Sequence, residues 1–206
     1  MKKKQGQAVD VLALTGAQEG ILLETDLSGN PATYAGQSVL EVGAANPDLI
    51  QEAVDILIAR HEGLRTSFHW KKLSRPVAVV HEHAEITLVR NDLSDVQDAE
   101  LEAKRLFADD LEQGFDYTEP PLLRVRLVQL SPDRSLFGLT THHVALDGWS
   151  TALVLAELRE AYVSLAETGT ASFSRPVPPR LRAYAAWLSD RDDMADFWRE
   201  TLAEVD

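Results

Sequence analysis

The feature that most constrains the fold is a strand, a histidine pair and a helix in direct succession. Residues 135–141 (SLFGLTT) have the apolar and β-forming character of a buried strand. Residues 150–166 have the apolar spacing of a helix, and Ser150 stands where an N-cap would lie. Between them lies HHVALDG, residues 142–148. This segment predicts two histidines at the end of a rigid strand, where a side chain can face a cleft.

The two histidines are expected to have different roles. Successive side chains of a strand point to opposite faces, so His142 and His143 cannot both face the same cleft. We expect His142 to be buried and structural, and His143 to be available. A neutral imidazole, with an ordinary pKa near ~6.5, can accept a proton around pH ~7. The chain has no Cys and no evident Ser-His-Asp pattern, so direct base chemistry is the simpler interpretation.

Asp147 and Gly148 also have a purely structural interpretation. In tight turns Asp hydrogen-bonds its own backbone, and Gly tolerates positive φ values. The whole HHxxxDG pattern, however, is expected by chance in only about one in a thousand chains of this length. The pattern therefore favours chemistry for the histidine pair and a supporting role for Asp147 and Gly148.

Composition limits the classes of function. At 206 residues the chain can form one domain with a substantial core. Its net charge of -13 argues against nucleic acid and anionic membranes, which bind through Lys and Arg. The absence of Cys excludes disulfides, thiolate metal sites and a Cys nucleophile. Neither a membrane span nor a signal peptide is evident, so we expect a cytoplasmic protein with a disordered tail at residues 1–9.

Local patterns place the other elements of the chain. Thr15 and Gln18 form a capping box, and Asn46 followed by Pro47 marks the start of a second helix. Polar and apolar alternation predicts strands, and apolar spacing predicts further helices. A hairpin turn at 131–133 is expected to join strand 122–130 to the strand that carries the histidines. The expected strands are 34–42, 66–70, 77–81, 86–90 and 122–130, and the expected helices are 95–113 and segments around 184–187 and 192–202.

His81 and His83 have the spacing of two metal ligands on one strand face. No nearby Asp or Cys completes a site, and histidines are common on surface strands. We therefore predict no metal site, and the sequence indicates no directly bound cofactor.

Four stretches, in order, resemble the condensation domains of nonribosomal peptide synthetases, in the chloramphenicol acetyltransferase-like superfamily. The HHVALDG stretch matches the central motif of that family. Residues 14–22 (LTGAQEGIL) and 60–68 (RHEGLRTSF) resemble its first and second motifs. Residues 184–188 (YAAWL) are a weaker match to the fourth, because the usual acidic residue after the Tyr is missing.

The resemblance implies the fold. It covers residues 10–206 and corresponds to the N-terminal lobe of a condensation domain, an α+β lobe with a mixed β-sheet flanked by helices. The later motifs of the family lie in a second lobe, which is absent from this chain. In the family the active site lies in a tunnel between the two lobes, and carrier proteins deliver substrates from opposite sides.

The resemblance also implies the chemistry. The amine of a carrier-bound aminoacyl group attacks a carrier-bound acyl thioester, with His143 as the base or the amine-positioning group. Arg65 is expected to pair with Asp147 and to hold the histidine loop, and Gly148 to allow close approach of the substrate arm and to offer its N–H to an oxyanion. Phosphopantetheine arms of carrier proteins bring the substrates. The motif opens with His, not Asp, which disfavours the related heterocyclisation domains.

Partners and alternatives follow from the same comparison. Because the first motif begins close to Met1, we expect the donor carrier to act in trans. The missing half of the tunnel requires a second condensation lobe or self-association. Carrier proteins are often acidic, so an acidic chain needs a local docking patch. Two alternatives stay open: an acyltransferase of the superfamily that uses coenzyme A thioesters, and a non-catalytic lobe that binds carrier proteins.

Overall fold

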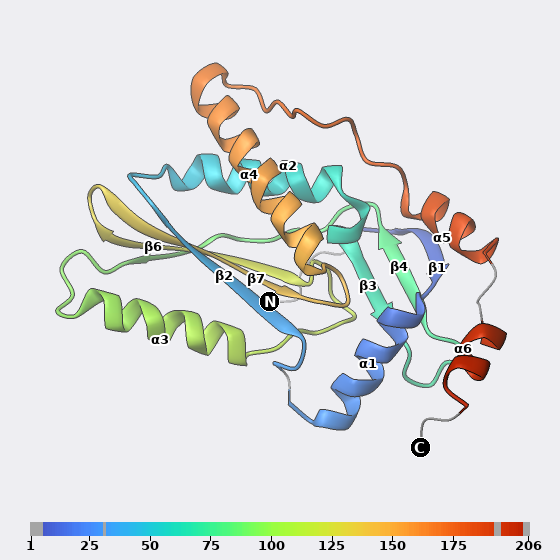
Figure 1. Cartoon of the computed structure of the whole chain (residues 1–206). Helices are drawn as coiled ribbons and strands as arrows, with labels where there is room; N and C mark the ends of the chain where they lie inside the picture. Colours follow the sequence, from blue (N-terminus) through green and yellow to red (C-terminus); the bar gives the residue numbers. More distant parts are fainter. Residues whose placement is uncertain (1–5, 31, 192–194, 204–206) are drawn as a thin grey trace.

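The computed structural model describes residues 6–30, 32–191 and 195–203. Two β-sheets lie end to end, and helices pack against both faces of the larger sheet (Figure 1). The strands are β1 (Ala8–Ala13), β2 (Ala35–Val42), β3 (Thr66–His69), β4 (Val77–His81), β5 (Val89–Asp92), β6 (Leu123–Ser131) and β7 (Arg134–His142). The helices are α1 (Gly16–Ser28), α2 (Pro47–Arg60), the short 3-10 helix η1 (Glu62–Arg65), α3 (Ala99–Glu112), α4 (Gly148–Thr168), α5 (Leu181–Ser189) and α6 (Ala195–Thr201).

The larger sheet has the strand order β2-β7-β6-β5 and is mixed, because β5 and β6 are parallel while the other pairs are antiparallel. Helices α2 and α4 cover one face and α3 covers the other (Figure 1). Alternate side chains of β6 serve the two cores: Val125 packs with α2 and α4, and Val128 packs with Phe107 of α3. The predicted α+β class, with a mixed sheet flanked by helices, is confirmed.

The smaller sheet has the order β1-β4-β3, with both pairs antiparallel. Phe68 of β3 and Ala78 of β4 share an apolar cluster with Leu22 of α1 and with Val144, which follows the histidine pair. The two sheets are therefore joined at the histidine loop. Strand β1 was missed by the sequence analysis, and the predicted tail is wrong for Ala8 and Val9, because both lie in this strand and Ala8 pairs with His81; residues 1–5 lie outside the described residues.

Two of the three predicted helix N-caps are formed in the structure. Thr15 accepts a hydrogen bond from Gln18 N while the Gln18 side chain accepts one from Thr15 N, so the capping box is confirmed. Asn46 caps α2 as predicted. The predicted cap of α4 is wrong: Asp147, not Ser150, accepts the hydrogen bond of the first turn. Asp outcompetes because it precedes the turn with extended backbone angles and Ser150 lies inside the helix.

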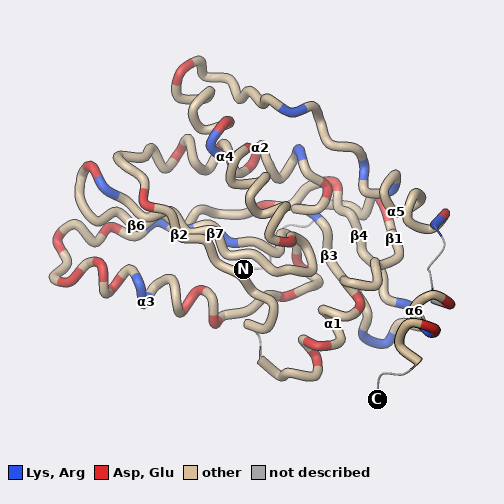
Figure 2. Tube along the Cα trace, in the orientation of Figure 1, with Lys and Arg blue, Asp and Glu red and all other residues tan. Residues whose placement is uncertain are grey.

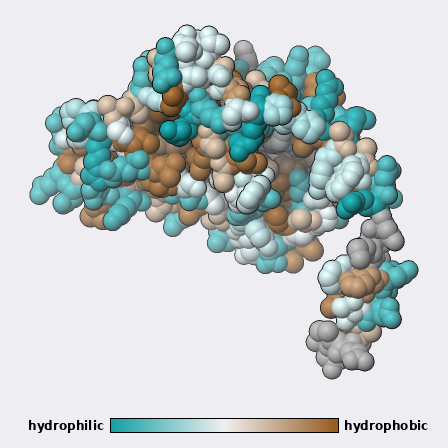
Figure 3. Space-filling view, turned by 45° about the horizontal axis from the view of Figure 1, so that its top comes forward, coloured by the Kyte–Doolittle hydropathy of each residue, from teal (hydrophilic) through white to brown (hydrophobic). Residues whose placement is uncertain are grey.

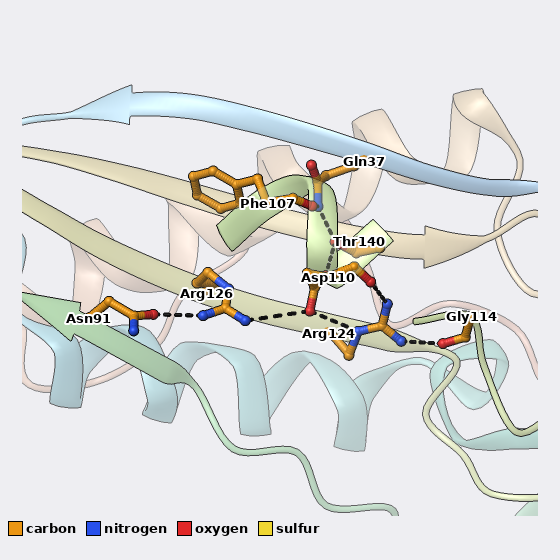
Figure 4. Close-up of polar contacts among 8 residues, drawn as sticks. All are labelled: Gln37, Asn91, Phe107, Asp110, Gly114, Arg124, Arg126 and Thr140. Atoms are coloured by element: carbon orange, nitrogen blue, oxygen red, sulfur yellow. Dashed lines mark hydrogen bonds and ion pairs between the residues drawn. The ribbon is translucent and has the colours of Figure 1, made fainter. Parts of the chain in front are cut away.

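Asp110 of α3 anchors the strand that carries the histidines (Figure 4). It is 7% exposed and accepts a hydrogen bond from Thr140 of β7 at 2.6 Å. From β6, Arg124 Nε donates to the same carboxylate at 3.0 Å, and a guanidinium nitrogen of Arg126 lies 3.8 Å away. Gln37 of β2 donates to the Thr140 hydroxyl at 2.8 Å. One carboxylate thus fixes three neighbouring strands against a helix.

Asp110→Asn removes the negative charge that faces Arg124 and Arg126, and leaves two largely buried guanidiniums without a neutralising group. We expect the free energy of unfolding to fall by about 3 kcal/mol, measured by denaturant titration. Asp109→Asn is the control, because the Asp109 side chain is exposed and forms no ion pair within the described ranges. It should change stability by less than about 0.5 kcal/mol. Equal losses in both variants would contradict this assignment.

Candidate functional site

The structure separates the two histidines as their positions in the strand predict. His142 is the last residue of β7 and is completely buried, whereas His143, in the turn that follows, is exposed. The backbone on both sides of the pair is fixed, because His142 N donates to Leu122 O at 3.2 Å and His143 N donates to Tyr34 O at 2.9 Å. One imidazole is therefore held inside the domain while the other faces solvent from a rigid base.

All three contacts of the His142 ring agree with one tautomer. Val144 N donates to Nδ1 at 3.2 Å, so Nδ1 carries no proton. The proton is on Nε2, which lies 2.9 Å from the carbonyl oxygen of Thr33 and 2.9 Å from the hydroxyl oxygen of Tyr117. Tyr117 and Phe115 also meet the ring edge-on, with centroid distances of 4.8 and 6.0 Å. His142 is thus a packed and hydrogen-bonded structural residue.

Burial lowers the pKa of His142 from 6.5 to about 4; the Thr33 carbonyl opposes this shift and His143 adds to it. Because the folded state binds the proton less well than the unfolded state, His142 contributes stability above pH 6.5 that is lost as the pH falls toward 4. Burial raises the pKa of Tyr117, so its hydroxyl keeps its proton throughout this range.

We expect the ring signals of His142 in an NMR titration to keep their neutral shifts from pH 8 down to about pH 5. At lower pH, proton binding favours the unfolded state, because each unit of difference between the folded and unfolded pKa of His142 corresponds to about 1.4 kcal/mol. Selective ¹³C labelling of histidine, with His142→Gln as the assignment control, gives the measurement. A titration midpoint near the ordinary histidine value would show that the ring is not held as described.

His143 has the properties of a group that is available to a ligand. Its Nε2 lies over Gly36 of β2, where an added Cβ would stand 3.6 Å from it. Within the described ranges, no hydrogen bond to its imidazole is found, so both ring nitrogens can serve a bound molecule. The carboxylate of Asp147 lies close enough for an electrostatic interaction with His143.

The loop after the histidines is fixed by its own backbone and by α1. Ala145 N and Leu146 N both donate to His142 O, at 3.0 and 3.1 Å. The side-chain amide of Gln18 donates to Val144 O at 3.1 Å, which explains why the first motif lies beside the central one. A Cβ placed on Gly148 would meet no atom within 4 Å, so the space in front of the first turn of α4 is open.

The expected pair between Arg65 and Asp147 is not formed, and this prediction is wrong for the described structure. Arg65 donates through NH1 to His81 O and has Glu62 at 3.8 Å. Asp147 accepts from Ser150 N at 2.7 Å, and this bond lowers the pKa of the carboxyl group. Helix capping satisfies Asp147 locally, and η1 directs Arg65 toward the smaller sheet. Both residues remain structural, but they support different elements.

A second buried carboxylate was missed by the sequence analysis. Glu157 of α4 is 4% exposed and accepts from Arg60 Nε at 2.9 Å and lies 2.8 Å from His61 Nε2. It joins α4, which follows the histidine loop, to the end of α2. The available signal was a Glu between Val154 and Leu158 on the apolar face of a helix. Tyr117 was also missed, because it lies in a Pro-rich loop whose sequence does not indicate a contact with His142.

Two hollows lie near these elements. One, of about 320 Å³, lies between α5 and the smaller sheet and reaches Ala145 of the histidine loop; Gln18 and Tyr184 line it. The other, of about 290 Å³, is apolar and lies between β2 and α4, where brown surface gathers in the left half of Figure 3. Of the residues that the structure describes, no group of three His, Asp or Glu is placed to hold a metal ion. None of the described helices is long and apolar enough to cross a membrane.

The sequence of this chain is similar to those of known proteins. A family model described as "Condensation domain" matches residues 8–206. Malpibaldin synthetase of Mortierella alpina is 33% identical over 201 residues, which cover 94% of this chain and 4% of that protein. A linear gramicidin synthase protein of Brevibacillus parabrevis is 32% identical over 197 residues, which again cover 94% of this chain and 4% of the relative.

The fold is similar to that of solved condensation domains. The starter condensation domain of rhizomide synthetase has a TM-score of 0.83 at 19% identity, over 96% of this chain and 49% of that one. The first condensation domain of the calcium-dependent antibiotic synthetase, solved with a substrate analogue, has a TM-score of 0.77 at 25% identity, over 95% and 48%. This chain therefore spans about half the length of these solved domains and a small part of the curated synthetases.

Proposed function

Since the chain belongs to the condensation-domain family, we propose that it is the histidine-bearing lobe of a catalyst that forms amide bonds in nonribosomal peptide synthesis. The observation that carries this proposal is the exposed imidazole of His143 on a fixed backbone beside the completely buried His142. The chain has no Cys. The hydroxyl of Ser67 lies 2.9 Å from His69 Nε2 and 2.8 Å from His81 Nε2, but Ser67 is fully buried and is no accessible nucleophile, which supports direct attack by the substrate amine.

The proposed step is aminolysis of a thioester. The nitrogen of the acceptor aminoacyl group attacks the carbonyl carbon of the donor, and a tetrahedral intermediate with a negative oxygen forms. His143 takes the N–H proton or holds the amine by a hydrogen bond, which favours the addition. When the C–S bond breaks, the proton passes to the departing thiolate, so an amide and a free thiol result. An amine with a pKa near ~8 is already partly free at neutral pH.

His142 and Asp147 support this step without direct contact with the reacting atoms. His142 holds the end of β7 through Thr33, Tyr117 and Val144. Asp147 caps α4 and keeps the loop closed. The open space at Gly148 would admit a substrate arm, and the N–H of that residue, at the start of a helix, would stabilise the negative oxygen.

Carrier domains with phosphopantetheine arms would supply both substrates, as in the synthetases to which this chain is similar. A flexible arm suits an exposed imidazole, because it delivers the thioester without a preformed pocket for the carrier itself. The arm is part of the substrate, and no residue here is proposed to bind a cofactor of its own.

An exposed aromatic surface supports the need for a second lobe or for self-association. Tyr184 and Trp187 of α5 stack at 5.7 Å and are about half exposed, and Phe197 and Trp198 of α6 are more than half exposed. No residue of α5 is buried. Aromatic surface of this kind is typical of an interface that is covered in the complete assembly. We propose that a second condensation lobe, or another copy of this chain, covers it and completes the cleft.

Intact-mass detection of amide formation tests the proposal. The assay uses donor- and acceptor-loaded carrier domains with this chain alone and with a second condensation lobe added. We expect product only when the cleft is complete, and we expect His143→Ala to reduce the rate by at least about 10²-fold. His83→Ala is the matched control, because His83 is also an exposed histidine but follows β4 of the smaller sheet, where it lies beside Gly6.

The outcomes separate the amide-forming catalyst from its two alternatives. Turnover by the lone chain, lost in His143→Ala, would indicate a cleft rebuilt by self-association. Activity only on mixing would indicate half of a split catalyst. Carrier binding without product under every condition would contradict catalysis and favour a non-catalytic lobe that binds carrier domains. Product formed with a free coenzyme A thioester, and not with a loaded carrier, would favour the other acyltransferase class.

A further inference from the structure

A proline-rich segment crosses the outside of the domain in an extended form between α4 and α5. We call residues 173–181 (FSRPVPPRL) the strap. Its beginning is fixed to α4, because Ser174 donates from its N–H and its hydroxyl to the two carboxylate oxygens of Glu160, at 3.0 and 2.7 Å. Its end is fixed to η1, because Leu181 N donates to Glu62 Oε2 at 2.8 Å. Both ends of the strap are therefore held.

A third anchor holds the middle of the strap. Arg60 donates through one guanidinium nitrogen to the carbonyl oxygens of residues 175 and 176, at 2.8 and 2.7 Å. The same guanidinium lies 4.3 Å from the ring centroid of Phe173 and is held by the buried carboxylate of Glu157. With three prolines and three anchors, the strap has a fixed backbone, so a partner that binds it loses little conformational entropy from this side.

One apolar and two basic side chains of the anchored strap extend into solvent. Val177 is 75% exposed, and Arg175 and Arg180 on either side of it are exposed. Within the described ranges neither arginine forms a hydrogen bond or close ion pair through its side chain. Glu160 interacts with Arg175, and Asp10 with Arg180, only through longer-range electrostatics, and both carboxylates already accept hydrogen bonds, Glu160 from Ser174 and Asp10 from Arg182. The two guanidiniums are free to meet an anionic partner.

The strap differs in charge from the rest of the chain. It holds two arginines and no acidic residue, in a protein of net charge -13. Figure 2 shows blue positions along the strap and predominantly red positions along α3, on the other side of the larger sheet. A negatively charged protein would be repelled by most of this surface and attracted at the strap.

The spacing of the arginines indicates the kind of partner. Arg175 and Arg180 are five residues apart, and a proline-rich chain of this length in the polyproline II form spans about 15 Å. When the two side chains extend away from the strap in parallel, their guanidiniums face anionic groups about this far apart. On an α-helix, with a rise of about 1.5 Å per residue, the same span separates carboxylates about ten residues apart. The strap therefore matches an acidic helix on the surface of a folded protein, with Val177 placed for a central apolar contact.

We propose that the strap is the docking surface for an acidic helix of a carrier domain. This inference rests on the proposed function, because that function is what requires a carrier. It also supplies the local patch that an acidic chain needs in order to bind an acidic partner.

Fluorescence anisotropy tests the proposal with labelled carrier domains from a panel of nonribosomal peptide synthetases, each in the apo and the phosphopantetheinylated form. We expect binding by at least one carrier in both forms, and about tenfold weaker binding to the double variant Arg175→Glu/Arg180→Glu. Lys104→Glu/Arg105→Glu on α3 changes the net charge by the same amount and should bind as the unmodified chain does. Salt should weaken binding to the unmodified chain more than binding to the strap variant.

Several results would overturn the proposal. They are no binding by any carrier of the panel, equal losses in both charge-reversed variants, or binding that requires the phosphopantetheine arm. Circular dichroism of each variant shows whether it is folded, and Val177→Asp offers a second change that leaves the three anchors in place. Amide formation is measured separately with soluble pantetheine thioesters and with the second condensation lobe added: binding at the strap without amide formation would keep the docking surface and contradict the proposed function.

Discussion

The candidate site depends on the burial of one neutral imidazole. His142 closes β7 inside the domain and links three separate segments through Thr33, Tyr117 and Val144. Because successive side chains alternate, fixing His142 inward also fixes the direction of His143 outward. The chemical group is therefore positioned by a residue that does no chemistry, and the low pKa of His142 follows from the same burial that gives it this role.

Two buried carboxylates extend this support through the domain. Asp110 joins α3 to β6 and β7 on one face of the larger sheet, and Glu157 joins α2 to α4 on the other. Removing one partner from such a pair leaves a charge in a poorly solvated place, so these contacts fix geometry strongly even where they add little net stability. Arg60, which donates to Glu157, also donates to the backbone of the strap. The same side chain therefore links the buried carboxylate to the outer surface of the domain.

Local signals in the sequence predicted the fold well. The caps at Thr15 and Asn46, the hairpin between β6 and β7, and the division of the histidine pair follow from short-range hydrogen bonding and strand alternation. Long-range polar pairs could not be predicted in this way. Asp147 accepts a hydrogen bond from Ser150 in the first turn of α4, and this local partner competes with Arg65. In the sequence, Asp110 and Glu157 look like any other acidic residues of their helices, because their partners lie on distant elements.

In the proposed mechanism the end of β7 presents His143 to the substrate and keeps His142 buried. The most direct measurement is an NMR titration of ¹³C-histidine-labelled protein with a stable amide analogue of an aminoacyl-pantetheine. We expect the ring signals of His143 to shift as the analogue binds and those of His142 to stay unchanged. Movement of the His142 signals alone, or binding that leaves both rings unaffected, would contradict it.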